Sequence, residues 1–177
     1  MMQQIVIVNN MKTLVVVDMQ NDFLTGVLGV KNPEIVINNV CELIRNWKGN
    51  IIVTLDTHGC DYLETREGNN LPIVHCVKPT SGWQINDEVA KSLSMKPRVK
   101  YVEKDSFGQF YWDVDDEGEI TLVGVCSDIC VINNALILRN LFKSRQINVV
   151  EDCCAGTTEE NHKKAMDIMK INHINIL

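Results

Sequence analysis

The 177-residue sequence lacks any apolar run that approaches the roughly 18 residues of a membrane-spanning helix. It also lacks an excess of basic residues, because 23 Asp and Glu against 17 Lys and Arg give a formal net charge of -6 at pH 7. Without a Lys/Arg run, neither nucleic acid nor an anionic membrane surface is an expected partner. The N-terminus has neither the basic segment nor the cleavage site of a secretory signal, so we expect a cytoplasmic protein.

The seven cysteines show no regular spacing and no CxxC pair, which argues against a zinc ribbon and against a thioredoxin-like redox site. Several lie inside apolar runs, where a reduced cysteine packs as a small apolar side chain. A chain of this length buries roughly 70% of its unfolded surface and needs no disulfide bonds for stability. The cysteine pattern is therefore typical of a reducing cytoplasm.

Short, continuously apolar runs are typical of buried parallel strands rather than of strands with one solvated face. The clear runs are residues 13–17, 50–55, 120–125 and 146–150, and weaker ones are residues 98–102 and 174–177. Helical patterns lie between them: Pro33 opens one, Asp128 precedes a second and Thr158 precedes a third. This alternation predicts a single-domain α/β fold, with a parallel, Rossmann-like sheet of about six strands and helices on both faces.

Two segments do not follow the alternation. Residues 3–8 form an additional apolar segment, so we expect an N-terminal extension over residues 1–12 and the folded domain over residues 13–177. The extension has two interpretations, an edge strand or an appended arm, and Met11 is an alternative start. Residues 57–96 have little strand signal, and loops longer than about 15 residues in a compact domain are usually functional.

Chemically reactive residues follow the predicted strands at their carboxyl ends, where the sites of open α/β sheets form. In chain order these residues are Asp18, Asp56, His58, Lys104, Cys126 and Cys130. Each one alone has an ordinary explanation, as a turn former, a solvated lysine or a core cysteine. An acid, a base and a thiol at one edge of one sheet instead predict an active site.

The motifs around these residues resemble those of the isochorismatase-like cysteine hydrolases. They are VVVDMQNDF at 15–23, DTH at 56–58, PIVHC at 72–76, KDSF at 104–107 and GVCSDICV at 124–131. The resemblance runs from Thr13 to the C-terminus in the family's order. The Asp-x-His pair, with His75 further along, resembles the nicotinamidase/pyrazinamidase branch most closely.

The resemblance implies a catalytic triad of Cys130, Asp18 and Lys104. A free thiol has a pKa of about 8.5 and is only a few per cent ionised at pH 7, so the nucleophile needs activation. We expect a helix N-terminus and the Lys104 ammonium to lower the pKa of Cys130 until most of the thiol is ionised. Asp18 would carry the proton from the thiol to the leaving amine and then activate the water that hydrolyses the thioester.

The resemblance also implies an oxyanion hole. In the family a cis peptide bond precedes the residue four positions before the nucleophile, which is the Val125–Cys126 bond here. The backbone N–H groups of Cys126 and Cys130 would then bind the developing oxyanion. Because Cys126 places a second thiol near the nucleophile, oxidation to a Cys126–Cys130 disulfide is an expected liability.

A divalent-metal site formed by Asp56, His58 and His75 is implied in the same way. Two imidazoles and one carboxylate suit Zn²⁺, Fe²⁺ or Mn²⁺, and of these we expect Zn²⁺. In nicotinamidases the ion binds the pyridine nitrogen and orients the ring, whereas isochorismatases and several other branches lack the site. Either histidine alone is more typical of a hydrogen-bonded loop residue, so the prediction depends on their spacing.

Four side chains are candidates for the substrate pocket. Phe23 and Phe107 resemble, by position, the aromatic walls that enclose the ring. Ile129 stands where the family commonly has tyrosine, and Trp83 either lines the pocket or covers the sheet. After His58 the chain departs from the usual nicotinamidase pattern, which leaves the substrate open.

The residues and the resemblance together predict a metal-containing cysteine amidohydrolase that converts nicotinamide to nicotinate and ammonia through a thioester on Cys130. One alternative is a related hydrolase of another small amide, carbamoyl or imide compound, with isochorismate a more remote substrate. Another is a non-catalytic binding or oligomerisation module, which the presence of all three triad residues argues against. The expected partners are a small-molecule amide and further copies of the chain in a homo-oligomer.

Overall fold

A computed structural model describes residues 11–114 and 117–177 of the chain. The apolar segment at residues 3–8 lies outside the described residues, so the expected N-terminal extension and the domain boundary after it stay predictions. Among the described residues, no helix combines the length and the apolar character that crossing a bilayer requires.

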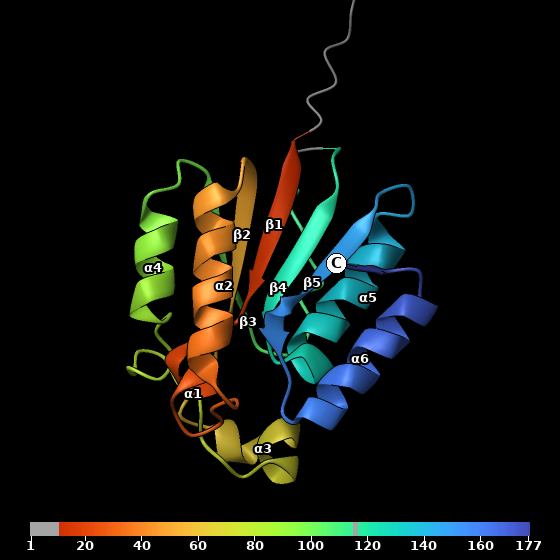
Figure 1. The fold of residues 1–177 in the computed structure, drawn as a ribbon. Helices are drawn as coiled ribbons and strands as arrows, with labels where there is room; N and C mark the ends of the chain where they lie inside the picture. Colours follow the sequence, from red (N-terminus) through yellow and green to blue (C-terminus); the bar gives the residue numbers. More distant parts are fainter. Residues whose placement is uncertain (1–10, 115–116) are drawn as a thin grey trace, which may run out of the picture.

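Six strands form one parallel sheet in the spatial order β3-β2-β1-β4-β5-β6 (Figure 1). The strands are β1 (Lys12–Val17), β2 (Gly49–Asp56), β3 (Val99–Lys104), β4 (Ile120–Val125), β5 (Ile147–Ala155) and β6 (Asn175–Ile176). The continuously apolar runs of the sequence form the central strands, which are buried on both faces. The predicted parallel α/β sheet is therefore confirmed.

Alternate side chains of β1 point to two separate apolar layers. Leu14 and Val16 belong to the cluster that includes buried side chains of α2 (Pro33–Asn46) and α4 (Asp87–Ser94). Val15 and Val17 belong to the cluster on the other face, with α5 (Ile132–Leu141) and α6 (Glu159–Ile171). Helices thus cover both faces, as predicted, because both sides of the sheet carry apolar side chains (Figure 1).

Two of the three predicted helices begin where their sequence signals indicated. Pro33 is at the first turn of α2, and Thr158 caps α6 by accepting a hydrogen bond from Asn161 N at 3.0 Å. The third predicted helix, after Asp128, is present but begins in a different way. A π-helical turn, η2 (Ser127–Val131), leads into α5, and the Asp128 carboxylate accepts hydrogen bonds from the backbone and hydroxyl of Thr157.

Residues 57–96 contain more regular structure than their weak pattern indicated. They hold a single 3₁₀ turn, η1 (Tyr62–Glu64), the short helix α3 (Arg66–Asn70) and the two-turn helix α4. A further short helix, α1 (Asn21–Leu24), follows β1. In Figure 1, α1 and α3 lie at the end of the molecule towards which the strand arrows point, so these short elements surround the carboxyl edge of the sheet.

The last long strand extends beyond its predicted end. Residues 146–150 are followed by five more strand residues, so Cys153 and Cys154 lie within β5 rather than in a loop after it. Both are buried, Cys153 in the α2 and α4 cluster and Cys154 in the α5 and α6 cluster. All seven cysteines are free thiols.

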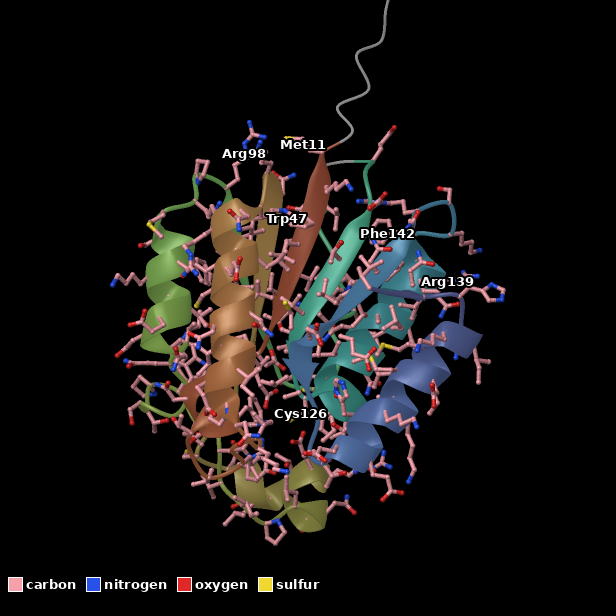
Figure 2. The ribbon with its side chains drawn as sticks, in the orientation of Figure 1. Met11, Trp47, Arg98, Cys126, Arg139 and Phe142 are labelled. Atoms are coloured by element: carbon pink, nitrogen blue, oxygen red, sulfur yellow. The ribbon has the colours of Figure 1, made fainter. Side chains whose placement is uncertain are left out.

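The two ends of the sheet differ in character. Figure 2 shows Met11 and Arg98 at the amino end of the strands and Cys126 near the opposite end. Because all strands are parallel, the residues that follow β1, β2, β3 and β4 meet at the carboxyl end. The sheet topology therefore gathers the predicted triad residues and Asp56 at this edge.

Candidate active site

Asp18 follows the last residue of β1 in a left-handed backbone conformation, with φ of 48°. Aspartate adopts this conformation more readily than most residues, and it turns the chain out of the sheet. The neighbouring strand approaches closely: at Gly124, φ is 119° and an added Cβ would lie 2.1 Å from Val17 O. Only glycine fits there, so the end of β4 lies directly against the end of β1.

Lys104 brings the three predicted triad residues together. Its Nζ lies 2.7 Å from Asp18 Oδ2 and 3.7 Å from Cys130 Sγ. The other Asp18 oxygen accepts a hydrogen bond from Thr54 Oγ1 at 2.6 Å. Asp18 is fully buried, and Lys104 and Cys130 are each 5% exposed. These three side chains, from two strand ends and the turn after a third strand, thus form one contact group shielded from water, while their catalytic roles remain predictions.

Burial sets the resting protonation of the group. Burial, assisted by the nearby Asp18, raises the pKa of Cys130 well above its ordinary value, although the Lys104 charge opposes this. The expectation that most of the thiol is ionised is therefore wrong, because the cost of burying a thiolate exceeds the stabilisation from one ammonium. Burial also raises the pKa of Asp18 despite the ion pair with Lys104. A raised carboxylate pKa favours Asp18 as the acceptor of the thiol proton.

Lys104 remains charged in this environment. Burial alone would lower its pKa, but the negative charges of Asp18 and Asp56 raise it above the ordinary value for lysine. Its Nζ also donates to Ser106 O at 3.0 Å and contacts Asp56 Oδ1 at 3.2 Å. An ammonium with this many acceptors is held in one position between the thiol and the carboxylate.

The turn that carries the nucleophile has the expected cis Val125–Cys126 peptide bond, which confirms that prediction. Cys126 and Cys130 flank the π-helical turn, and burial raises the pKa of Cys126 to about 12, so it is an unreactive thiol. The turn is anchored from α6, where the Ser127 hydroxyl lies 2.9 Å from His162 Nδ1. The oxyanion hole itself stays a prediction, and both thiols are free.

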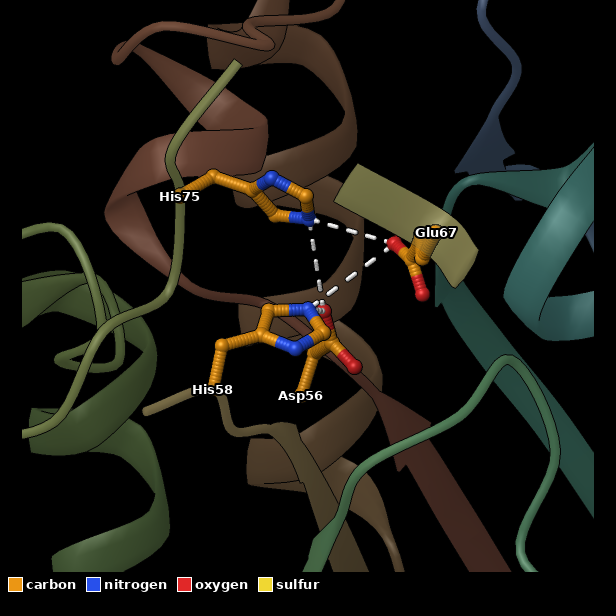
Figure 3. Close-up of side chains that lie close together, drawn as sticks. All are labelled: Asp56, His58, Glu67 and His75. Carbon is orange, nitrogen blue, oxygen red and sulfur yellow. Dashed lines mark hydrogen bonds and ion pairs between the residues drawn. The ribbon is translucent and has the colours of Figure 1, made fainter. Parts of the chain in front are cut away.

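A second cluster lies beside the triad and contains four possible metal ligands. Asp56, His58, Glu67 and His75 each offer one ligand atom, and these atoms all lie within 4.8 Å of one another. Figure 3 shows the four side chains pointing toward a common centre. His58 Nε2 lies 2.9 Å from Asp56 Oδ2, and His75 Nε2 lies 3.6 Å from both Asp56 Oδ2 and Glu67 Oε1.

This donor set fits a divalent ion. Two imidazole nitrogens and two carboxylates are ligands for Zn²⁺, Fe²⁺ or Mn²⁺. Burial alone would lower the pKa of His75, but hydrogen bonds to Asp56 and Glu67 raise it to about 10 in the metal-free protein. Burial would raise the pKa of Asp56, but hydrogen bonds from both histidines lower it below its usual range. A bound cation would replace the protons that otherwise compensate these carboxylates.

A family model for the isochorismatase domain matches residues 12–176. The chain belongs to the isochorismatase family. The nicotinamidase of Saccharomyces cerevisiae is 27% identical in an alignment 217 residues long, which covers 94% of this chain and 99% of that protein. An isochorismatase family protein of Bacillus subtilis is 31% identical over 175 residues, which cover 88% of this chain and 92% of that protein.

Solved structures of isochorismatase-like proteins share this fold. The structure of the yeast nicotinamidase Pnc1p has a TM-score of 0.79 and 26% identity, over 94% of this chain and 99% of that one. The structure of the pyrazinamidase of Pyrococcus horikoshii in complex with zinc has a TM-score of 0.76 and 25% identity, over 94% of this chain and 98% of that one. Both alignments cover nearly the whole of each chain.

Within this member of the isochorismatase family, Glu67 is the potential ligand that the sequence interpretation missed. It lies on α3, whose first turn is capped by Thr65 Oγ1, which accepts a hydrogen bond from Gly68 N at 3.0 Å. A threonine two residues before a glutamate is a common helix start and gives no indication of metal binding. Only the folding of residues 59–71 over His58 brings this carboxylate to the cluster.

The DMQNDF motif also supports the metal cluster through its last two residues. Asp22 Oδ2 accepts a hydrogen bond from the backbone N–H of Cys76 at 2.8 Å and so holds the segment that carries His75. The ring of Phe23 packs edge-on against the His75 imidazole, with the two ring centroids 5.5 Å apart. The His75 Nδ1 lies 2.7 Å from Ile73 O, which leaves Nε2 directed at the cluster.

The four candidate pocket residues lie in different environments. Phe23 is 6% exposed and lies against His75, whereas Phe107 is 43% exposed. Ile129 is half-buried and contacts both apolar clusters. Trp83 packs against the α2 and α4 cluster, and its Nε1 donates to Thr57 Oγ1 at 2.9 Å. Contact of any of the four side chains with substrate stays a prediction.

Proposed function

We propose that this protein is a nicotinamidase, which hydrolyses nicotinamide to nicotinate and ammonia through a thioester on Cys130. The observation that carries the proposal is the position of Lys104, whose Nζ contacts Asp18, Cys130 and Asp56 at once. Through Asp56, the thiol–carboxylate–ammonium group adjoins a cluster able to hold a divalent ion. The named nicotinamidases and the pyrazinamidase among its relatives support the same reaction.

Acylation would begin with a neutral thiol. Cys130 Sγ attacks the amide carbon while its proton passes to Asp18, and the carbonyl oxygen becomes an oxyanion held by the backbone N–H groups of Cys126 and Cys130. Asp18 then returns the proton to the amide nitrogen. The C–N bond breaks and ammonia leaves, so one S–C bond has replaced one C–N bond.

Deacylation would use the same carboxylate in the opposite sense. Asp18 takes a proton from water, whose oxygen attacks the thioester carbon. The C–S bond breaks, the first proton returns to the Cys130 sulfur, and the product leaves as nicotinic acid, which ionises to nicotinate by giving its proton to solvent. Throughout both steps Lys104 stays protonated, because its pKa lies above the ordinary value, and it compensates whichever of the two partners is negative.

We assign the metal-binding role to Asp56, His58, Glu67 and His75, with Zn²⁺ as the expected ion. When bound, a divalent ion would supply an electrophilic contact for the pyridine nitrogen of the substrate. The residues that hold it are positioned by the backbone of β2, by α3 and by the segment before Cys76. Their contribution is to orient the ring, whereas the proton transfers belong to Asp18.

A direct experiment tests the proposal. Purified protein is incubated with nicotinamide, with and without prior chelation and Zn²⁺ reconstitution, and ammonia is measured. We expect turnover by the reconstituted wild type and none by Cys130→Ala. Release of ammonia at the same rate by the variant would refute a Cys130 thioester.

A second candidate is hydrolysis of a different small amide or carbamoyl compound by the same thiol. Two departures from the usual nicotinamidase pattern favour this alternative: Ile129 in place of the common tyrosine next to the nucleophile, and the Gly59–Cys60 sequence after His58. Pyrazinamide and several carbamoyl compounds assayed beside nicotinamide would separate the candidates by kcat/KM.

The remaining proposals concern context. We propose a cytoplasmic enzyme of pyridine-nucleotide salvage, supported by seven free cysteines that suit a reducing compartment. We also propose a homo-oligomer, supported by large exposed aromatic side chains, of which Phe110 is 65% and Tyr111 is 89% exposed. Light scattering of the purified protein would test the oligomer.

A further inference from the structure

Gln20 is a fully buried residue to which the proposed reaction gives no role. Its side-chain amide makes three hydrogen bonds, all to main-chain groups. Oε1 accepts from Asp56 N at 2.8 Å, while Nε2 donates to Asp56 O at 2.9 Å and to Trp83 O at 2.8 Å. One side chain therefore binds both main-chain polar groups of Asp56.

The reason lies in the end of β1. The last paired residues of β1 and β2 are Val17 and Thr54, and Asp18 N still donates to Thr54 O at 3.2 Å. The left-handed conformation of Asp18 then turns the chain away, and Asp18 O accepts from Gln20 N at 2.7 Å instead. Two residues beyond Thr54, the N–H and C=O of Asp56 would lose their ladder partners. The Gln20 amide supplies one acceptor and one donor in their place.

Asp56 is also the residue on which both clusters depend. Its Oδ1 lies 3.2 Å from Lys104 Nζ, and its Oδ2 lies 2.9 Å from His58 Nε2. On its other side, β3 holds it through the pairing of Asp56 with Lys104. Without Gln20, Asp56 would be held only on the side of β3, and its buried main-chain N–H and C=O groups would lack hydrogen-bond partners.

We propose that Gln20 is a positioning residue: its side-chain amide replaces the missing strand beside Asp56 and fixes that carboxylate for metal binding and for contact with Lys104. The inference rests on the proposed function for the purpose of the metal cluster. The same amide joins Trp83 O, so it also ties the segment before α4 to the carboxyl edge of the sheet.

The test compares Co²⁺ binding by metal-free wild type, Gln20→Met and a matched control, Asn148→Leu. Methionine keeps the length of glutamine and removes the three hydrogen bonds. Asn148 is another buried amide, at the amino end of the sheet, where it bonds Glu119 and Thr121. We expect the Kd for Co²⁺ to rise about 10- to 100-fold in Gln20→Met, with altered visible absorption bands, and to be unchanged in Asn148→Leu.

Gln20→Glu provides a second variant. It keeps an acceptor for Asp56 N but directs a carboxylate at the carbonyl oxygens of Asp56 and Trp83, so weaker Co²⁺ binding is expected again. The inference is overturned if folded Gln20 variants bind Co²⁺ within about two-fold of Asn148→Leu. It is also overturned if wild type binds no Co²⁺, or if neither Gln20 variant folds while Asn148→Leu does. Because no substrate is present, the result is independent of whether nicotinamide is hydrolysed.

Discussion

Asp56 belongs to the metal cluster and also contacts Lys104 of the triad. The two clusters are nevertheless built in different ways. Asp18, Lys104 and Cys130 each come from the end of a different strand or the turn after it, so the sheet register determines their separation. In the metal cluster only Asp56 is a strand residue. His58, Glu67 and His75 all come from the irregular segment between β2 and α4.

This difference assigns different tasks to the two clusters. Groups that exchange protons need a separation that does not vary, and a parallel sheet provides it. Groups that orient a substrate can be supplied by a segment whose length and shape differ among related proteins. Loss of a triad residue should therefore reduce kcat, whereas loss of a metal ligand should change metal affinity and KM first.

The largest expected effect is that of Cys130→Ala. Removal of the nucleophile should reduce kcat for nicotinamide hydrolysis by about 10⁴-fold or more, measured as ammonia release. Cys41→Ala is the matched control, because Cys41 is a buried thiol on α2, away from the carboxyl edge. A large loss in the control would mean that thiol burial rather than nucleophilicity explains the first result.

Asp18→Asn should come next. The asparagine keeps the shape of the side chain but cannot accept the thiol proton, so kcat should fall by about 10²- to 10⁴-fold with a smaller change in KM. Thr54→Val removes only the hydrogen bond to Asp18 Oδ1 and should cost much less. Equal losses in the two variants would contradict a proton-transfer role for Asp18.

The triad could be anticipated from the chain because it follows the sheet. Continuous apolar runs identify β1, β2 and β4, and the residue after each run is then placed at a known edge. The same logic fails for Glu67, which lies in a polar segment with no periodic pattern. Strand positions also do not predict the pKa of Cys130. Its burial depends on how the surrounding helices and turns pack, which cannot be read from any single motif.

The errors at β5 and η2 have a related cause. Glu151 and Asp152 interrupt the apolar run, so the continuation of the strand to Ala155 depends on the neighbouring β4, to which it is hydrogen-bonded. The helical pattern after Asp128 is present as α5, but its regular part begins only at Ile132. The π-helical turn Ser127–Val131 has its own hydrogen bonds to Cys126 O, from Ile129 N and Val131 N, and no periodic apolar pattern of the sequence indicates it.

Glu67→Gln tests whether Glu67 is a ligand of the metal cluster. A neutral amide is a weaker ligand than a carboxylate, so the affinity for Zn²⁺ should fall at least about 10-fold, with KM affected more than kcat. Glu64→Gln, three residues away on the exposed part of η1, is the matched control. Competition with a chromogenic chelator measures both affinities, and equal values would remove Glu67 from the ligand set.

The smallest expected effect is a pH dependence of stability in the metal-free protein. Folding raises the pKa of His75 from its ordinary value of 6.5 to about 10, so protonated His75 favours the folded state. This stabilisation is complete below pH 6.5 and is lost as pH rises through about 10. Between pH 6.5 and about 8.5, Tm of wild type should therefore fall by a few degrees more than Tm of His75→Asn. Parallel curves for the two proteins would contradict the assignment.

The central claim is that nicotinamide hydrolysis passes through a covalent bond to the triad thiol. Rapid acid quenching of the reaction, followed by mass spectrometry of peptides, measures this most directly. We expect a nicotinoyl group on the peptide that contains Cys130 during turnover, and its disappearance after the substrate is consumed. A turning-over enzyme whose only nicotinoyl adduct lies on another residue would contradict it.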